Sequence, residues 1–213
     1  MKNLRDLEIN DLKKLLEEMG EKPFRAKQIY TWLHQNLVEH YDEMTNISKG
    51  LRDRLSAEYS VALPETVEVL TSKIDGTKKF IFRMQDGHVI ESVWMEYQHG
   101  HSVCISSQVG CRMGCKFCAS TLDGLARNLT SGEMLGQIYQ IQRTTGVRVD
   151  NIVIMGSGEP LDNYDEFTRF IRMISDENGL HISRRNITIS TCGLVPRIRQ
   201  LADENYGITL ALS

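Results

Sequence analysis

The second half of the chain alternates short apolar segments with stretches of helical periodicity, and no other feature restricts the fold as strongly. Strands that alternate with helices predict a parallel sheet joined by right-handed crossovers. We therefore expect an α/β core over residues 102–213. The expected strands are Val103–Ser107, Asn151–Gly156, Asn186–Thr191 and Ile208–Ser213. The expected helices run from about Ser131 to Thr144, from about Tyr164 to Ser175, and briefly after Pro196.

Residues 63–101 have the pattern of antiparallel strands instead. Two dipeptides that favour tight hairpin turns, Asp75-Gly76 and Asp86-Gly87, separate three strand-like segments. We expect an antiparallel meander with Glu91 in its third strand. The segments are Thr66–Ile74, Thr77–Arg83 and Val89–Met95.

Residues 1–62 are expected to form a small helical accessory domain. Asn10 is a candidate cap for a helix that continues to Glu18. Pro23 is suited to the first turn of a second helix, and a third is expected over Ser48–Tyr59. Such a domain packs on another part of the molecule.

The composition is that of an ordinary globular protein, with 41% apolar and 25% charged residues. The net charge of -3 gives no overall attraction to nucleic acid or to a membrane, although local basic patches remain possible. The sequence has neither a secretory signal at its start nor an apolar run that spans a bilayer. We expect a cytoplasmic protein without membrane contact. Because the chain stops inside its fourth core strand, we also expect it to be the front portion of a longer protein.

Three of the five cysteines, Cys111, Cys115 and Cys118, have the spacing Cys-x3-Cys-x2-Cys. Three thiolates from one loop suit three irons of a four-iron, four-sulfur cluster and leave the fourth iron without a protein ligand. A small molecule can then bind that iron, and the amino and carboxylate groups of S-adenosylmethionine are suitable donors. Gly110 and Gly114 allow the loop to fold tightly around the cluster.

Zinc is the alternative occupant of these cysteines, with Cys104 or a histidine as the fourth ligand. Structural zinc sites usually draw their ligands from two paired elements, and this chain has a single Cys-x2-Cys pair. The spacing favours iron–sulfur and does not decide between the two.

The cysteine motif, placed after the first strand of an alternating strand–helix core, resembles the radical S-adenosylmethionine superfamily. In that superfamily a reduced [4Fe-4S] cluster cleaves S-adenosylmethionine to a 5′-deoxyadenosyl radical. The segment MGSGEPLDN resembles the glycine-rich motif that holds the methionine group, which implies cofactor-binding roles for Gly158 and Glu159. ITISTCG resembles the strand whose serine contacts the cofactor, here Ser190, and Ser213 matches a further contacting serine. The resemblance implies a partial (βα) barrel.

The resemblance is closest to the dual-specificity 23S rRNA and tRNA adenine-C2 methyltransferases, the RlmN-like group. The segments that carry it are CISSQVGCRMGCKFCASTLDGLARNLTSGE, MGSGEP, ITISTCGLVP and VIESVWME. It implies 23S rRNA and tRNA as substrates and an electron donor such as flavodoxin or ferredoxin.

The resemblance also implies a methyl-cysteine intermediate. In the group, S-adenosylmethionine first methylates a carboxy-terminal cysteine, and the carbon radical made from that methyl group adds to adenine. By analogy Glu91 accepts a proton, and Cys104 releases the adduct by forming a disulfide with the methyl-carrying cysteine. Local sequence alone favours a buried core residue for Cys104 and an exposed strand carboxylate for Glu91, and the resemblance reverses the interpretation of Cys104. Cys192 is taken as structural.

The methyl-carrying cysteine has no counterpart in this chain, so we expect the chain by itself not to complete RNA methylation. Two other functions stay open. One is methylation of adenine C8 by the related antibiotic-resistance group, although Pro160 after Glu159 favours the C2 group. The other is a non-catalytic zinc- or RNA-binding protein.

Overall fold

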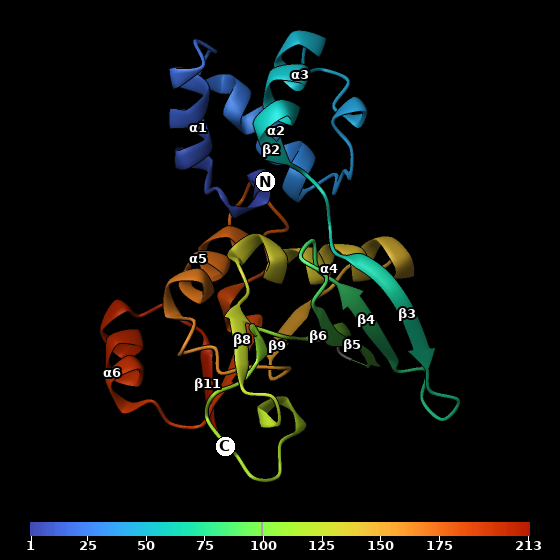
Figure 1. The fold of residues 1–213 in the computed structure, drawn as a ribbon, viewed down its shortest axis with the longest axis vertical. Coiled ribbons are helices and arrows are strands. Elements are labelled where there is room, and N and C mark those ends of the chain that lie inside the picture. The colour runs from blue at the N-terminus through green and yellow to red at the C-terminus, as the bar shows by residue number, and fades with distance from the viewer. Residues whose placement is uncertain (99) are drawn as a thin grey trace.

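A computed structural model describes residues 1–98 and 100–213 and shows a helical layer above a mixed sheet (Figure 1). The helical layer contains α1 (Ile9–Glu18), α2 (Phe24–His34) and α3 (Lys49–Glu58), and two short strands, β1 (Lys2–Asn3) and β2 (Tyr59–Ser60), pair beside them. The remaining elements are β3 (Glu65–Thr71), β4 (Lys78–Arg83), β5 (Val89–Tyr97), β6 (Gly100–Ile105), β7 (Gln108–Gly110), β8 (Leu125–Asn128), α4 (Ser131–Thr145), β9 (Asn151–Ile154), α5 (Tyr164–Ile174), β10 (Ile187–Thr191), α6 (Val195–Glu204) and β11 (Thr209–Leu212).

The expected meander and the expected parallel core form one seven-stranded sheet, in the order β11-β10-β9-β6-β5-β4-β3. The strands β3 to β6 are antiparallel, as the hairpin dipeptides predict. β6, β9, β10 and β11 are parallel, as the strand–helix alternation predicts. β6 therefore joins the two halves. The α/β fold class is confirmed, whereas the domain boundaries at residues 62 and 101 stay a prediction.

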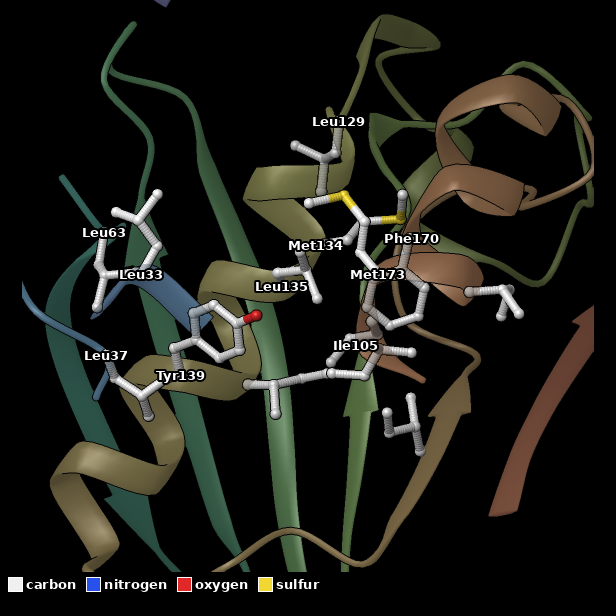
Figure 2. Close-up of a cluster of buried hydrophobic side chains, with 14 of the residues drawn as sticks. Leu33, Leu37, Leu63, Ile105, Leu129, Met134, Leu135, Tyr139, Phe170 and Met173 are labelled. Atoms are coloured by element: carbon white, nitrogen blue, oxygen red, sulfur yellow. The ribbon is translucent and has the colours of Figure 1, made fainter. Parts of the chain in front are cut away.

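Helices α4 and α5 provide a large part of the apolar core. Their inward faces carry fully buried side chains, among them Leu135, Ile138, Phe167 and Phe170. Figure 2 shows that one end of α4 lies with Phe170 and Met173 of α5, while Tyr139 lies near leucines of the amino-terminal region. Each large apolar side chain buried in this way contributes about 1.5–3 kcal/mol. α4 thus serves as the common packing surface for both layers.

Local signals set the ends of α4 more clearly than those of α1. Thr130 and Glu133 form a capping box at the start of α4, and Gly146 ends it in the left-handed conformation. The prediction that Asn10 caps α1 is wrong, because the helix begins at Ile9 with Glu8 as the preceding residue. The Glu8 carboxylate instead accepts a 2.5 Å hydrogen bond from Arg172 of α5.

The amino-terminal helices are attached to α4 through buried polar groups. The guanidinium of Arg5 is fully buried and donates to the carbonyl oxygens of Leu33, at 2.5 Å, and Val38. The His34 Nδ1 and the Tyr139 hydroxyl are 2.7 Å apart. Buried polar groups are stable only when they are hydrogen-bonded. The Arg5 contacts therefore order the amino-terminal layer, and the His34–Tyr139 contact joins that layer to α4.

Within the described residues, none of the helices has both the length and the apolar character that crossing a membrane requires.

The buried histidine generates a prediction about stability and pH. Burial, together with the nearby Arg5 cation, lowers the pKa of His34 well below its ordinary value of 6.5. Below that pH the unfolded chain binds a proton that the folded protein does not, so stability falls as the pH falls. We expect His34 to contribute a loss of about 1.4 kcal/mol per pH unit below pH 6.5.

Urea unfolding of the wild type and of His34→Gln between pH 7.5 and pH 5 measures this contribution. The variant is expected to show a shallower dependence of the unfolding free energy on pH, whatever its stability at pH 7.5. Equal slopes for the two proteins would rule out His34 as the source.

Candidate cofactor site

A cavity of about 220 Å³ lies at the carboxyl edge of the parallel strands, where α/β sheets usually bind ligands. Seven of the nine site residues expected from the sequence line it, and they come from four separate segments. They are Cys111, Cys115, Cys118, Gly158, Glu159, Ser190 and Ser213. Strand order and register therefore bring together residues that are up to about half the chain apart.

A hairpin that the sequence did not reveal supports the cysteine loop. β7 and β8 pair on either side of it, and the Cys111 N–H donates to the carbonyl oxygen of Gly124 at 3.0 Å. Gly110 has a φ of 74°, and a Cβ there would lie 2.0 Å from the same oxygen. Thr121 closes the loop by donating to the carbonyl oxygens of Cys115, at 3.1 Å, and Cys118, at 2.9 Å.

All five cysteines are free thiols. Burial raises the pKa of the Cys111 thiol, against a lowering by the backbone N–H of Met113. Within the described residues, no three His, Cys, Asp or Glu side chains are arranged as ligands of a single metal ion. The three cysteines nevertheless face one cavity, and three thiolates that bind different irons of one cluster need a common cavity. A bound metal also favours the thiolate form. The donor set therefore fits an iron–sulfur cluster.

The turn after β9 is held close to β6 and β7. The Gly156 N–H donates to the Ile105 carbonyl oxygen at 3.0 Å, and a Cβ on Gly156 would lie 2.7 Å from the Ser106 hydroxyl oxygen. Gly158 has a φ of 102°, and a Cβ there would lie 2.5 Å from the Cβ of Gln108. This close approach explains why the turn needs glycine at both positions.

Glu159 is almost fully buried, at 3% exposure, and its carboxylate holds two strands' ends together. Oε1 accepts from the Leu161 N–H at 3.0 Å, and Oε2 accepts from the Cys192 N–H at 2.8 Å. A carboxylate oxygen accepts more than one hydrogen bond, so Glu159 retains acceptor capacity toward the cavity that it lines.

The two serines expected to contact the cofactor lie side by side. The hydroxyl oxygens of Ser190 and Ser213 are 2.8 Å apart, because β10 and β11 are adjacent parallel strands. Cys192, for which a structural role stays a prediction, lines the same cavity and is exposed. Partial burial of its thiol, with a hydrogen bond to Glu159, raises the pKa of Cys192 to about 11.

Glu91 and Cys104 line a second cavity of about 510 Å³, which shares Cys118, Ser120, Met155 and Gly156 with the first. Glu91 is on β5, and its side chain is 56% exposed, with Oε2 at 2.8 Å from Nζ of Lys79. Cys104, on the neighbouring β6, is half-buried, and burial raises the pKa of its thiol. The two predicted catalytic residues thus lie in one cavity, next to the cysteine loop.

Sequence reasoning missed two polar residues that hold this edge of the sheet. The fully buried Gln137 accepts, through Oε1, from the Ser106 N–H at 2.9 Å and the Ser92 hydroxyl at 2.7 Å. The Ser106 hydroxyl donates to the Glu91 carbonyl oxygen at 2.7 Å and accepts from the Ser157 N–H at 3.0 Å. A glutamine on the apolar face of a helix was the available signal for this network.

The glycine-rich turn generates a prediction. Gly158→Ala introduces both a strained backbone conformation and a collision with Gln108. We expect it to lower the unfolding free energy by about 3 kcal/mol or more. Gly146→Ala is the matched control, because Gly146 has a φ of 71° and no atom within 4 Å of the added Cβ. It should cost about 1 kcal/mol in the same urea titration. Equal losses would contradict the close approach of the turn to Gln108.

Two family models match the chain. The one described as "Ribosomal RNA large subunit methyltransferase N-terminal domain" matches residues 2–61. The one described as "Radical SAM superfamily" matches residues 105–211, which include all of β9 and β10, the last residue of β6 and all but the last residue of β11.

Three similar curated relatives carry the name "Probable dual-specificity RNA methyltransferase RlmN". The protein from Lachnoclostridium phytofermentans is 61% identical over 99% of this chain and 59% of its own length. Those from Lachnospira eligens and Clostridium novyi are 54% and 50% identical over 100% of this chain and 61% and 62% of theirs. These names confirm the resemblance to the RlmN-like group. The chain spans about three fifths of the length of these relatives.

A solved structure supports the same assignment. The crystal structure of a radical SAM methyltransferase from Sphaerobacter thermophilus superposes with a TM-score of 0.93 at 40% sequence identity. The match covers 100% of this chain and 63% of the Sphaerobacter thermophilus chain, which confirms a partial radical SAM fold for the described residues. On the superfamily match, the relatives and the shared fold, this chain belongs to the radical SAM superfamily.

Proposed function

We propose that this chain provides the cluster- and S-adenosylmethionine-binding part of an enzyme that methylates adenine C2 in 23S rRNA and tRNA. The observation that carries the proposal is the single cavity lined by the three motif cysteines, the glycine-rich turn and the two serines. The names of the relatives support RNA methylation as the reaction. We propose the cytoplasm as its location and flavodoxin or ferredoxin as its electron donor.

In this proposal Cys111, Cys115 and Cys118 hold a [4Fe-4S] cluster that, when bound and reduced, supplies the electron for cleaving S-adenosylmethionine. Gly158 and Glu159 receive the methionine group of the nucleoside. Because Gly158 has no side chain, the methionine group can approach the backbone closely at this position. The Glu159 carboxylate offers an acceptor for the ammonium group of the methionine. Ser190 and Ser213 offer hydroxyl groups in the same cavity.

The second cavity is the proposed place of the substrate adenine. Glu91 accepts a proton at its carboxylate, and its ion pair with Lys79 must break for Oε2 to reach that proton. Cys104 acts as a nucleophile toward the sulfur of a cysteine that is joined through a methylene group to adenine. The S–S bond forms as the sulfur–methylene bond breaks, and the electron pair leaves with the carbon, which takes up a proton and becomes the methyl group. That step needs the thiolate, and burial favours the protonated thiol, so Cys104 must lose its proton in the substrate-bound state.

We also propose that residues 1–62, 63–101 and 102–213 are the accessory domain, the strand meander and the incomplete barrel core. The limits of the two family models, at residues 61 and 105, support the first and third of these parts. The exposed faces of the accessory domain and the meander are candidates for contact with structured RNA, which is recognised chiefly by shape and phosphate.

Metal analysis tests the proposal. Protein reconstituted without oxygen is expected to bind about four irons and four sulfides per chain and to turn brown. Cys115→Ala should lose most of this iron, whereas Cys192→Ser, the matched control at the same cavity, should retain it. Colourless protein that holds one zinc per chain would overturn the proposal and favour a non-catalytic binding protein.

Mapping the position of the methyl group on modified RNA would distinguish methylation of adenine C2 from methylation of adenine C8.

A further inference from the structure

An ion pair joins the cysteine loop to the segment that follows the glycine-rich turn. Arg112, directly after the first motif cysteine, donates to the Asp162 carboxylate through Nε at 2.9 Å and Nη2 at 2.5 Å. The Arg112 side chain is 61% exposed and that of Asp162 only 11%. Surface ion pairs usually contribute little, but a two-point contact to a largely buried carboxylate is geometrically specific.

The same carboxylate is connected to the turn through Gln108. The side-chain nitrogen of Gln108 donates to Asp162 Oδ2 at 2.9 Å and to Asn128 Oδ1 at 2.8 Å. Its side-chain oxygen accepts from the Glu159 N–H at 2.8 Å. Since Gln108 is fully buried, water cannot replace these partners, and loss of one leaves a polar group unpaired.

Gln108 also restrains the turn by shape. Its backbone N–H donates to the Ser157 carbonyl oxygen at 3.1 Å, and its Cβ fills the space that a side chain on Gly158 would need. A displacement of the cysteine loop at Arg112 therefore reaches Glu159 through three successive contacts: Arg112 with Asp162, Asp162 with Gln108, and Gln108 with the Glu159 N–H.

We propose that Asp162 and Gln108 are positioning residues that couple the cysteine loop to the Gly158–Glu159 turn, so that the affinity for the nucleoside cofactor depends on the Arg112–Asp162 pair. The identity of the ligand in this inference rests on the proposed function. The coupling itself rests only on the contacts described above. The coupling fixes the position of the cysteine loop relative to the Gly158–Glu159 turn before the cluster or the nucleoside binds.

The first experiment uses the metal-free chain and needs no cofactor. Arg112→Ala changes an exposed residue, and hydrogen–deuterium exchange is followed separately over residues 111–122 and 156–163. We expect exchange in the second segment to accelerate about fivefold, although the substitution is in the first. Arg83→Ala is the control, because it removes an exposed ion pair between Arg83 of β4 and Glu65 of β3, and it should change neither segment.

Asp162→Asn is the complementary variant, because it keeps a hydrogen-bond acceptor for Gln108 and loses the charged pair. Asp162→Asn should accelerate exchange over residues 156–163. The double variant Arg112→Ala/Asp162→Asn should exchange no faster than Asp162→Asn alone. Arg112→Lys, which keeps the charge without the two-point contact, should fall between wild type and Arg112→Ala. Acceleration confined to residues 111–122 would overturn the coupling.

The second experiment measures equilibrium binding of S-adenosylmethionine to cluster-loaded protein. Arg112→Ala should weaken binding about fivefold at unchanged iron content, and Arg83→Ala should not. Unchanged affinity in Arg112→Ala would overturn the dependence of cofactor affinity on the pair. If the wild type takes up no iron and binds no nucleoside, the proposed function fails, and so does the part of the inference that concerns cofactor affinity. The exchange experiment then still decides the coupling.

Discussion

The pairing of β6 on both sides is the constraint from which the rest of the structure follows. β6 is antiparallel to β5 and parallel to β9, so one strand joins the meander to the parallel core. This double pairing places Cys104 beside both halves of the sheet. The chain that leaves β6 also leads directly into Gln108 and the cysteine loop. The position of β6 thus determines where both cavities lie.

Beyond the ends of the parallel strands, side chains replace the backbone ladder as the source of hydrogen bonds. Asn163 donates to the carbonyl oxygens of Ser107, at 2.9 Å, and Leu129, at 2.8 Å, while Gln137 and Gln108 fulfil similar roles nearby. Loops at this edge need such partners, because buried backbone groups without hydrogen bonds are unstable. The buried amides therefore give the site a defined shape without regular secondary structure.

The two cavities share a wall made in part by Cys118 and Met155. The cofactor in the smaller cavity and the adenine in the larger cavity would therefore be neighbours, as the proposed reaction between cofactor, cysteine and adenine requires. The exposed Glu91–Lys79 pair, by contrast, is a solvent-facing contact. Its proposed role in proton transfer depends on a bound substrate that displaces water from this cavity.

The sequence by itself determined the order of strands and helices, the hairpin turns and the cysteine spacing, because these depend on residues close together in the chain. It did not reveal the β7–β8 hairpin, whose two short strands lack alternation and are separated by the whole cysteine loop. Nor did it reveal the contacts of Gln108 with Glu159, 51 residues away, or of Arg112 with Asp162, 50 residues away. Only the tertiary structure decided these contacts, since they depend on which strands are neighbours and in which register they pair.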